Sequence, residues 1–288
     1  MPEISAAMVM ELRKMSGQGM MDCKKALQET NGDVEQAMDL LRKKGLATLA
    51  KRAGRDTSEG LVVCKSSEDG KTAVLATLCC ETDFVAKSDD FVATAKTLAD
   101  YALACPADEG VDNLLETSVD GKTFNGILTE TVSKTGEKTQ VGDYAKYSID
   151  GPGLIGTYIH FNEKVGTMLQ IETGDVATAN NEALQQTATD IAMHITATKP
   201  MALDKDQIDP ETIEREKAIF AEQVKGKPEN IIGKIVEGKM QKFYVENCLL
   251  QQPFVKDDSK TIEQVLAEAA QQAGGEAKMK RFVRFEVG

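Results

Sequence analysis

The sequence feature that most constrains the fold is a corner between an apolar run and an amphipathic segment. The apolar run, residues 73–78, predicts a buried strand and leads into Cys79-Cys80-Glu81-Thr82-Asp83-Phe84-Val85-Ala86-Lys87. Asp89-Asp90 then opens a segment in which apolar residues recur at helical spacing: Phe91, Ala95, Leu98, Ala102 and Cys105. The corner therefore joins a strand to a helix, and the chain combines both kinds of element.

This corner carries apolar side chains where polar or turn-forming residues are typical. Phe84 and Val85 stand directly beside Asp83. Two interpretations fit the pattern. Either Phe84 folds back onto the core beneath the helix, or the ring and the carboxylate project and enter a partner.

Two related halves are indicated by a second pass through the same order of elements. The first half has a predicted hairpin, 61–64 and 72–78, before its corner. The second begins at Asp143, with strands over 144–149, 154–160 and 165–171, a corner at Glu172-Thr173-Gly174-Asp175 and a helix that stops at Lys199-Pro200. Glycine and aspartate occupy the second corner where the first has Asp83-Phe84. That difference favours a functional role for Phe84.

Residues 1–55 predict a small module of three helices followed by a linker. An apolar stripe of Met8, Leu12 and Met15 defines the first helix, and Met20 begins the second after Gly17-Gln18-Gly19. Asp33 caps a third helix, which we expect to end at Gly45, so that residues 46–58 form the linker.

The remaining segments complete an α+β fold. Between the halves, helices are predicted from about Leu114 and over 124–134, ending at Gly136. An antiparallel helical hairpin is predicted over about 209–250, with a turn at Gly226-Lys227-Pro228. A last helix, 261–272, precedes a strand in which Val283, Phe285 and Val287 face one way. We therefore expect a core of antiparallel sheets packed with helices, with its first half over 56–142 and its second over 143–288.

Charge and composition narrow the classes of function. The net charge of −12 argues against a nucleic-acid binder, because the phosphate backbone favours Lys and Arg. Residues 1–55 nevertheless contain ten Lys or Arg against seven Asp or Glu. This basic head is either a solvated helix end and linker or a surface for an acidic partner. Six scattered cysteines, no apolar run of about 20 residues and an acidic start at Met1-Pro2-Glu3 predict a cytoplasmic protein with reduced thiols and no membrane contact.

No convergent catalytic chemistry is visible in the sequence. The two histidines, His160 and His194, lack metal-ligand spacing, and no phosphate-binding glycine loop is present, so we expect no metal, no cofactor and no direct nucleotide binding. His194 lies on the flank of its helix stripe, which is typical of a structural histidine. His160 closes a strand beside a turn, where a partner can reach it. Cys79-Cys80 is interpreted as the end of a buried strand.

Five motifs in this chain resemble the translation elongation factor Ts family. They run in the family's order over nearly the whole chain: Gly17-Gln18-Gly19-Met20-Met21-Asp22-Cys23-Lys24-Lys25-Ala26-Leu27, Glu81-Thr82-Asp83-Phe84-Val85, Ile191-Ala192-Met193-His194, Gln252-Pro253-Phe254-Val255 and Arg281-Phe282-Val283-Arg284-Phe285-Glu286-Val287-Gly288. The resemblance implies a guanine-nucleotide exchange factor, not an enzyme, that binds elongation factor Tu and promotes GDP release during translation elongation. It also implies a ubiquitin-associated-like fold for the three-helix module, which touches the GTPase domain, and a coiled-coil arm for the hairpin.

The resemblance further implies which residues contact elongation factor Tu. Thr82, Asp83, Phe84 and Val85 are expected to disturb its Mg²⁺ and phosphate site, Phe84 as a wedge between helices and Asp83 beside the metal. Further expected contacts are Lys24, Lys51, Gly136, His160, Phe254 and Val255. Family members continue into a C-terminal helix that also touches the GTPase, whereas this chain stops at Gly288. We therefore expect exchange to persist through the corner, with lower affinity.

Two other classes of function stay open. One is a non-catalytic interaction protein whose three-helix head binds a peptide or a client, for which Phe84→Ala leaves nucleotide release unchanged. The other is a thiol enzyme that uses Cys80, which requires a reactive thiol of low pKa.

Overall fold

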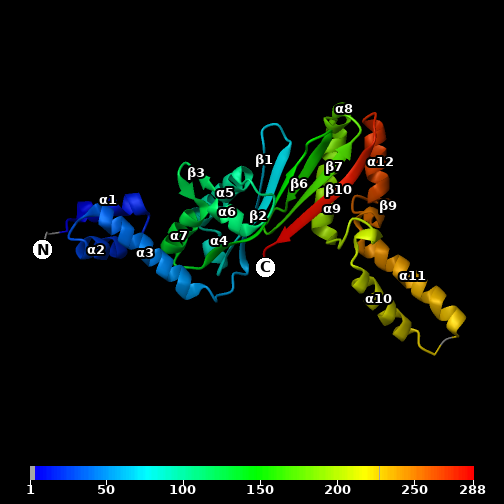
Figure 1. The fold of residues 1–288 in the computed structure, drawn as a ribbon, viewed down its shortest axis with the longest axis horizontal. Coiled ribbons are helices and arrows are strands. Elements are labelled where there is room, and N and C mark those ends of the chain that lie inside the picture. The colour runs from blue at the N-terminus through cyan, green and yellow to red at the C-terminus, as the bar shows by residue number, and fades with distance from the viewer. Residues whose placement is uncertain (1–3, 227) are drawn as a thin grey trace.

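The computed structural model describes residues 4–226 and 228–288. The acidic start at Met1 to Glu3 and Lys227 of the predicted turn lie outside the described residues. In Figure 1 the molecule is elongated, with a bundle of three helices at the N-terminal end, two sheets with their helices in the middle, and a helical arm at the other end. The α+β architecture expected from the sequence is confirmed.

The N-terminal bundle consists of α1 (Ala6–Ser16), α2 (Met20–Glu29) and α3 (Val34–Arg52). Ser5 caps α1 by accepting a hydrogen bond from the Met8 N–H, and Gly17 ends it in the left-handed conformation, with φ of 67°. The predicted stripe of α1 is partly wrong: Leu12 is buried, but Val9 joins it in the core and Met15 is 57% exposed. The core of this bundle is small and consists of Val9, Leu12, Cys23, Ala26, Leu27, Ala37 and Leu41.

Gly45 does not end the third helix, because α3 continues to Arg52. A Cβ built on Gly45 would lie 2.6 Å from the Ser133 side-chain oxygen and 3.0 Å from the Thr129 carbonyl oxygen. The glycine therefore lets α3 pack closely against α7 (Phe124–Thr135), and the connection to the first sheet is limited to residues 53–58. The prediction of a linker over 46–58 is correspondingly too long.

The two halves of the core contain equivalent three-stranded antiparallel sheets. In each sheet the middle strand leads into a corner. The first sheet has the order β1 (Glu59–Ser66), β2 (Thr72–Cys80) and β5 (Thr139–Ser148), and the second has the order β10 (Ala277–Glu286), β7 (Val165–Thr173) and β6 (Gly153–Ile159). The sequence predicts the strand over 144–149 at the start of the second half. It is instead part of β5, which pairs with β2 in the first sheet.

Helices cover the outer face of each sheet. The first half adds α4 (Asp83–Ala86), α5 (Asp89–Ala104), α6 (Val111–Glu116), α7, and the short strands β3 (Ser118–Val119) and β4 (Lys122–Thr123). The second half adds α8 (Val176–Ala179), α9 (Glu182–Thr198), α12 (Ile262–Gln272), the short helices η1 (Lys205–Gln207) and η2 (Leu249–Gln251), and the strands β8 (Pro253–Phe254) and β9 (Asp257–Thr261).

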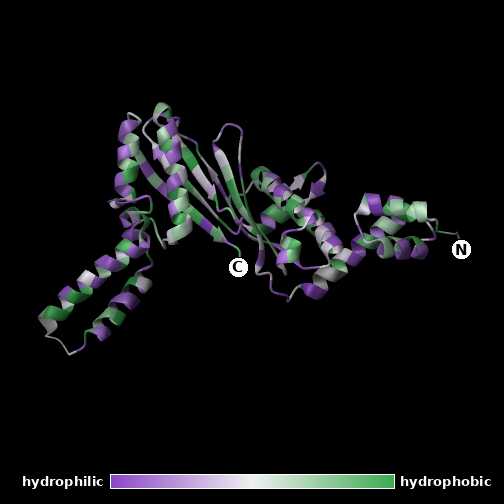
Figure 2. Cartoon of the chain, turned by 180° about the vertical axis from the view of Figure 1, so that it is seen from behind, coloured by the Kyte–Doolittle hydropathy of each residue, from purple (hydrophilic) through white to green (hydrophobic). Residues whose placement is uncertain are grey.

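The inner faces of the two sheets pack against each other. Leu75 and Tyr147 from the first sheet share a core with Met168 and Val287 from the second half. Gly166 makes this approach possible, because an added Cβ would lie 2.8 Å from Val62 and 3.0 Å from Leu75. The middle strands are thus buried on both faces, which explains their continuous apolar runs. In Figure 2 hydrophobic residues follow the strands of these sheets.

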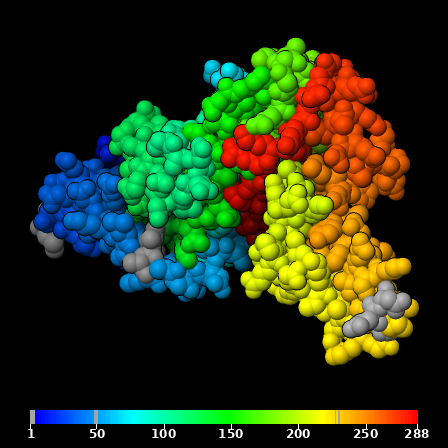
Figure 3. Space-filling view, turned by 45° about the vertical axis from the view of Figure 1, so that its right-hand side comes forward, coloured from blue at the N-terminus to red at the C-terminus, as the bar shows by residue number. Residues whose placement is uncertain are grey.

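The predicted helical hairpin is present as α10 (Pro210–Gln223) and α11 (Glu229–Asn247). Asp209 caps α10 through the Glu211 N–H, with Pro210 in the first turn. At the base of the arm Ile213, Phe243 and Tyr244 pack around a small core of Ala202, Ile208 and Cys248. The arm projects from the body in Figure 3. Within the described residues no helix is long and apolar enough to span a bilayer.

Candidate partner-binding site

The corner after β2 forms a one-turn helix, α4, because Thr82 caps it. Thr82 is extended, with φ of −131° and ψ of 155°, and its hydroxyl oxygen accepts a hydrogen bond from the Val85 N–H at 3.3 Å. Asp83 lies in the first turn, where a negative charge is favourable. Ser88 then caps α5 through the Phe91 N–H, so α4 ends after one turn.

The side chains of α4 point in different directions. Ala86 is buried and Val85 packs against the core of the first half, whereas Phe84 is 83% exposed. The interpretation that Phe84 folds back onto the core is therefore wrong, because Val85 and Ala86 occupy that position. The ring projects from its own fold.

The second corner, which served as a comparison in the sequence, begins its helix later than the first when both are counted from the shared Glu-Thr pair. In the first corner α4 begins at Asp83, two residues after Glu81. In the second, α8 begins at Val176, four residues after Glu172. Counted from the helix starts, Asp83 therefore corresponds to Val176, which corrects the matching of Asp83-Phe84 with glycine and aspartate. The second corner also exposes an apolar side chain, Val176, but no aromatic ring.

Residues distant in sequence hold the α4 corner in place. The Glu137 carboxylate accepts hydrogen bonds from the Thr82 N–H at 3.0 Å and from the Thr82 hydroxyl at 2.8 Å. Gly136 ends α7 with φ of 71°, which turns the chain toward Thr82. Next to it, Glu81 accepts a hydrogen bond from the Lys138 N–H and binds the Arg52 guanidinium, both at 2.7 Å. The corner is therefore fixed before any partner arrives.

The carboxylates of the corner are held in the charged form. The Lys138 N–H keeps the pKa of Glu81 below its ordinary value, and Arg52 adds to this effect. The hydrogen bond from Lys87, at 2.8 Å, keeps the pKa of Asp83 low, and the charge of Lys164 contributes. Phe84 is thus flanked by a fully ionised Asp83 at neutral pH.

The turn between β6 and β7 lies beside this corner and brings His160 to it. Lys164 binds Glu59 at 2.6 Å, and Glu59 pairs with Cys80 at the end of β2. His160 is half-buried, and its Nδ1 atom lies 3.3 Å from the Tyr158 hydroxyl. Gly136 lies at the α4 corner, next to the Glu137 that binds Thr82, and an added Cβ would meet nothing within 4 Å. The structure therefore gathers Thr82 to Val85, Gly136 and His160 on one edge.

The other predicted contacts lie elsewhere. Lys24 on α2 and Lys51 in the last turn of α3 are exposed on the N-terminal bundle. Val255, which is 49% exposed, follows β8 in the second half. Phe254 is only 6% exposed and packs in the core of that half, so its ring offers little surface to a partner, and its role as a direct contact stays a prediction. Burial gives its ring the role of anchoring the segment that presents Val255.

The surroundings of His194 and Cys80 indicate structural roles for both residues. His194 is fully buried, its Nε2 atom lies 2.8 Å from the Gln252 side-chain oxygen, and its Nδ1 atom accepts the Val255 N–H. Burial lowers its pKa. Cys80 is also buried, and desolvation together with the charge of Glu137 raises the pKa of its thiol to about 12. A thiol of that pKa is a poor nucleophile at neutral pH.

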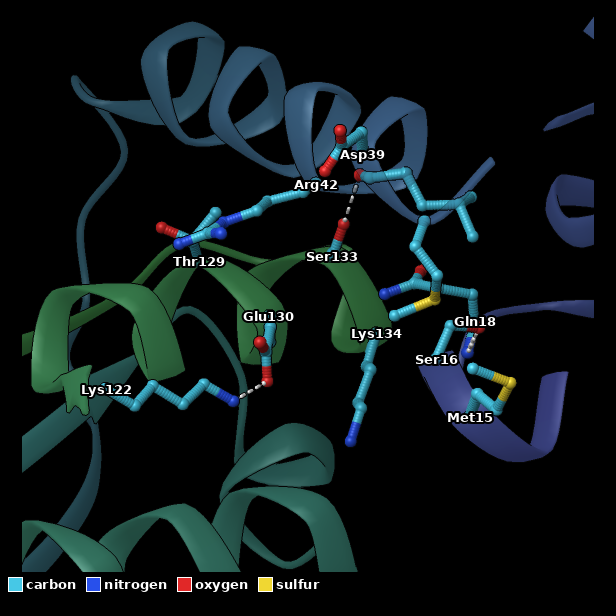
Figure 4. Close-up of a pocket in the computed structure, with 12 residues that line it drawn as sticks. Met15, Ser16, Gln18, Asp39, Arg42, Lys122, Thr129, Glu130, Ser133 and Lys134 are labelled. Atoms are coloured by element: carbon cyan, nitrogen blue, oxygen red, sulfur yellow. Dashed lines mark hydrogen bonds and ion pairs between the residues drawn. The ribbon is translucent and has the colours of Figure 1, made fainter. Parts of the chain in front are cut away.

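A pocket of about 320 Å³ lies between the N-terminal bundle and α7, beside their contact (Figure 4). Asp39 and Arg42 on α3 line it together with residues of α7, and the ion pair of Lys122 with Glu130, at 2.6 Å, forms part of its wall. The charges in its wall are mixed in sign, and no group of three potential metal ligands occurs in the part of the chain that the structure describes. This pocket therefore marks the contact between bundle and core.

Two residues of this edge are absent from the sequence-based site, Glu137 and Phe161. Glu137 follows the predicted contact Gly136, and a carboxylate next to a helix-ending glycine gives no signal of a partner 55 positions away. Phe161 stands beside His160 in the β6–β7 turn. An aromatic residue at a predicted turn is a signal that could have identified it, as it did for Phe84.

Known proteins provide an independent comparison. Residues 81–288 match the family model described as Elongation factor TS. Over 99% of this chain, the sequence is 44% identical to elongation factor Ts of a Nitratiruptor species and 43% identical to that of Clostridium botulinum (strain Alaska E43 / Type E3), covering 93% of each relative. The identity to elongation factor Ts of Nitratidesulfovibrio vulgaris is 41%, with 96% of that protein covered. The chain belongs to the elongation factor Ts family.

Proposed function

We propose that this chain binds elongation factor Tu and releases its GDP by inserting the α4 corner beside the Mg²⁺ and phosphate site. Family membership supports the coarser part, a nucleotide exchange factor for elongation factor Tu in translation elongation. The observation that carries the finer part is Phe84, which is 83% exposed on a helix that Glu137 and Thr82 hold in place. In this account the chain makes and breaks no covalent bond.

The mechanism is a coupling between two binding events. A GTPase retains its nucleotide through phosphate contacts and Mg²⁺, so a protein that stabilises a form with that site distorted weakens nucleotide binding. Nucleotide weakens the binding of the exchange factor by the same factor. Burying the exposed Phe84 ring in the partner contributes about 1.5–3 kcal/mol toward the distorted form.

Asp83 has the electrostatic part of this role. Its carboxylate is ionised and stands next to Phe84, so insertion of the ring brings a negative charge toward the metal site. Lys24, Lys51, Gly136, His160 and Val255 act as further contacts, with Phe254 supporting Val255 from the core.

A Mg²⁺ titration tests the role of Asp83. Release of labelled GDP from elongation factor Tu is measured with the wild type and with Asp83→Asn, at saturating Mg²⁺ and after chelation of Mg²⁺. We expect Asp83→Asn to slow release when Mg²⁺ is present and to match the wild type once the metal is removed. A deficit of the same size in both conditions would show that Asp83 acts by another route.

A further inference from the structure

A second exposed aromatic ring stands beside the α4 corner. Phe161, in the turn between β6 and β7, is 88% exposed. Its ring packs on that of His160, with 4.4 Å between centroids and a tilt of 50°. A single exposed apolar residue is ordinary on a protein surface, but several gathered on one edge indicate an interaction site.

The turn that carries Phe161 is held by hydrogen bonds at both ends. The His160 N–H donates to the Val165 carbonyl at 2.9 Å, and the Glu163 N–H donates to the His160 carbonyl at 2.8 Å. The Asn162 side chain accepts from the Lys164 N–H. The Val62 N–H in β1 donates to the Glu163 carbonyl at 2.7 Å, which joins the turn to the first sheet. The ring is therefore presented on a fixed support, and little ordering is needed when it binds.

Ion pairs at residues close to the two rings connect the β6–β7 turn with the end of β2, where Glu59 pairs with Cys80. The Lys164 ammonium binds Glu59, and its charge also acts on Asp83, the neighbour of Phe84. Asp83 in turn binds Lys87. In protein interfaces, aromatic residues are enriched in the buried core, and polar or charged residues form the rim around it.

We propose that Phe161, supported by the ring of His160, is a second aromatic anchor that binds an apolar recess on the same GTPase as Phe84. This inference rests on the proposed function and deepens it. The two rings differ in their roles. Phe84 enters and distorts the nucleotide site, whereas Phe161 contributes affinity in the ground state and in the distorted state alike. Continuity with the α4 corner identifies the occupant as the GTPase.

GDP release from elongation factor Tu, measured over a range of concentrations of this chain, separates these roles. We expect Phe161→Ala to raise the concentration needed for half-maximal release by roughly ten- to hundredfold, the value of burying one Phe ring. The release rate at saturation should stay near that of the wild type, because uniform binding does not change it. Phe161→Leu should retain part of the affinity. Val176→Ala, an exposed apolar residue at the second corner, is the matched control and should behave as wild type.

Each other outcome has a defined meaning. If Phe161→Ala matches Val176→Ala while Phe84→Ala slows release, the second anchor is wrong and the proposed function stands. If the wild type itself does not accelerate release, the proposed function fails and the anchor fails with it. Light scattering of the chain alone provides a further check: self-association that Phe161→Ala abolishes would assign the ring to a second copy and overturn the proposal. Thermal unfolding followed by circular dichroism confirms that each variant is folded, which the exposure of Phe161 leads us to expect.

Discussion

At the scale of single residues, the exposed ring of Phe84 depends on polar groups that never touch it. Thr82 caps α4, and Glu137 binds both the backbone and the hydroxyl of Thr82. A carboxylate that accepts two hydrogen bonds is difficult to replace, because its removal leaves both donors without that partner. Glu137 is therefore a positioning residue for Phe84.

Replacement of Glu137 tests this role. We expect Glu137→Ala to lower the free energy of unfolding by about 1–2 kcal/mol, because two hydrogen bonds to a charged group are lost, and to slow GDP release through the loosened corner. Glu130→Ala on α7, the helix that ends just before Glu137, is the control: its ion pair with Lys122 is exposed, and such pairs contribute about 0–1 kcal/mol. Denaturant unfolding and GDP release are measured for both. Equal effects of the two substitutions would refute the positioning role.

His194 predicts a pH dependence of stability. Its pKa is lowered in the folded protein by burial, from an ordinary value of 6.5. The unfolded chain therefore binds more protons than the folded one below about pH 6.5, so stability falls as the pH decreases through that value. Protonation at Nδ1 would also oppose the Val255 N–H that Nδ1 accepts. Thermal melts between about pH 8 and 5 should show this loss in the wild type and a smaller one in His194→Gln, which is less stable at pH 8. Parallel pH profiles would rule out His194 as the source.

At the scale of elements, the close contact of α3 with α7 attaches the N-terminal bundle to the core. This contact depends on Gly45, because any side chain at that position would collide with Ser133 and the Thr129 carbonyl. The Ser133 hydroxyl also donates to the Leu41 carbonyl at 3.4 Å. Through Arg52, the end of α3 then reaches Glu81 at the α4 corner.

Replacing Gly45 by alanine should destabilise the protein, which is the opposite of what helix propensity predicts. Alanine in place of glycine normally stabilises a helix by up to about 1 kcal/mol. We expect Gly45→Ala instead to lower the free energy of unfolding by about 1–3 kcal/mol, because the added methyl group forces α3 and α7 apart. Gly238→Ala in α11, where an added Cβ meets nothing within 4 Å, should stabilise the chain. Stabilisation by both substitutions would contradict the close contact of α3 and α7.

Some elements are predictable from sequence because local chemistry determines them. The turn at Gly17, the cap at Asp209 and the apolar face of α9 all act within a few residues. The end of α3 is not predictable in this way. The sequence around Gly45 suggests a helix end, and it gives no sign that α7 packs against this glycine. Likewise, the pairing of β5 with β2 depends on contacts between segments far apart in the sequence. The division of the chain at residues 55 and 142 stays a prediction, and the second boundary lies within β5.

For the candidate site, too, the sequence predicts what local residues determine and does not predict what depends on distant contacts. Phe84 is identifiable because an aromatic residue at a corner has no local explanation, and the family resemblance points to the same residue. Whether the ring projects depends on Val85 and Ala86 filling the space beneath the helix, which only the packed structure determines. Phe254 shows the opposite case, since a motif residue is buried and only its neighbour Val255 reaches the surface.

At the scale of the whole molecule, the two face-to-face sheets form the rigid part on which both corners are mounted. β2 and β7 are buried on both faces, so the corner that directly follows each strand starts from a well-packed position. In Figure 1 the N-terminal bundle and the helical arm extend from opposite ends of this core, and α4 lies between them. A partner that meets the α4 corner therefore has surfaces of the chain on either side.

The rate of GDP release from elongation factor Tu at saturating concentrations of the Phe84→Ala variant tests the central claim most directly. Because Phe84 is exposed, the variant should fold and melt as the wild type does, and Val176→Ala serves as the matched control. We predict that Phe84→Ala slows release by roughly ten- to hundredfold, whereas Val176→Ala does not. Release as fast with Phe84→Ala as with the wild type would contradict the account.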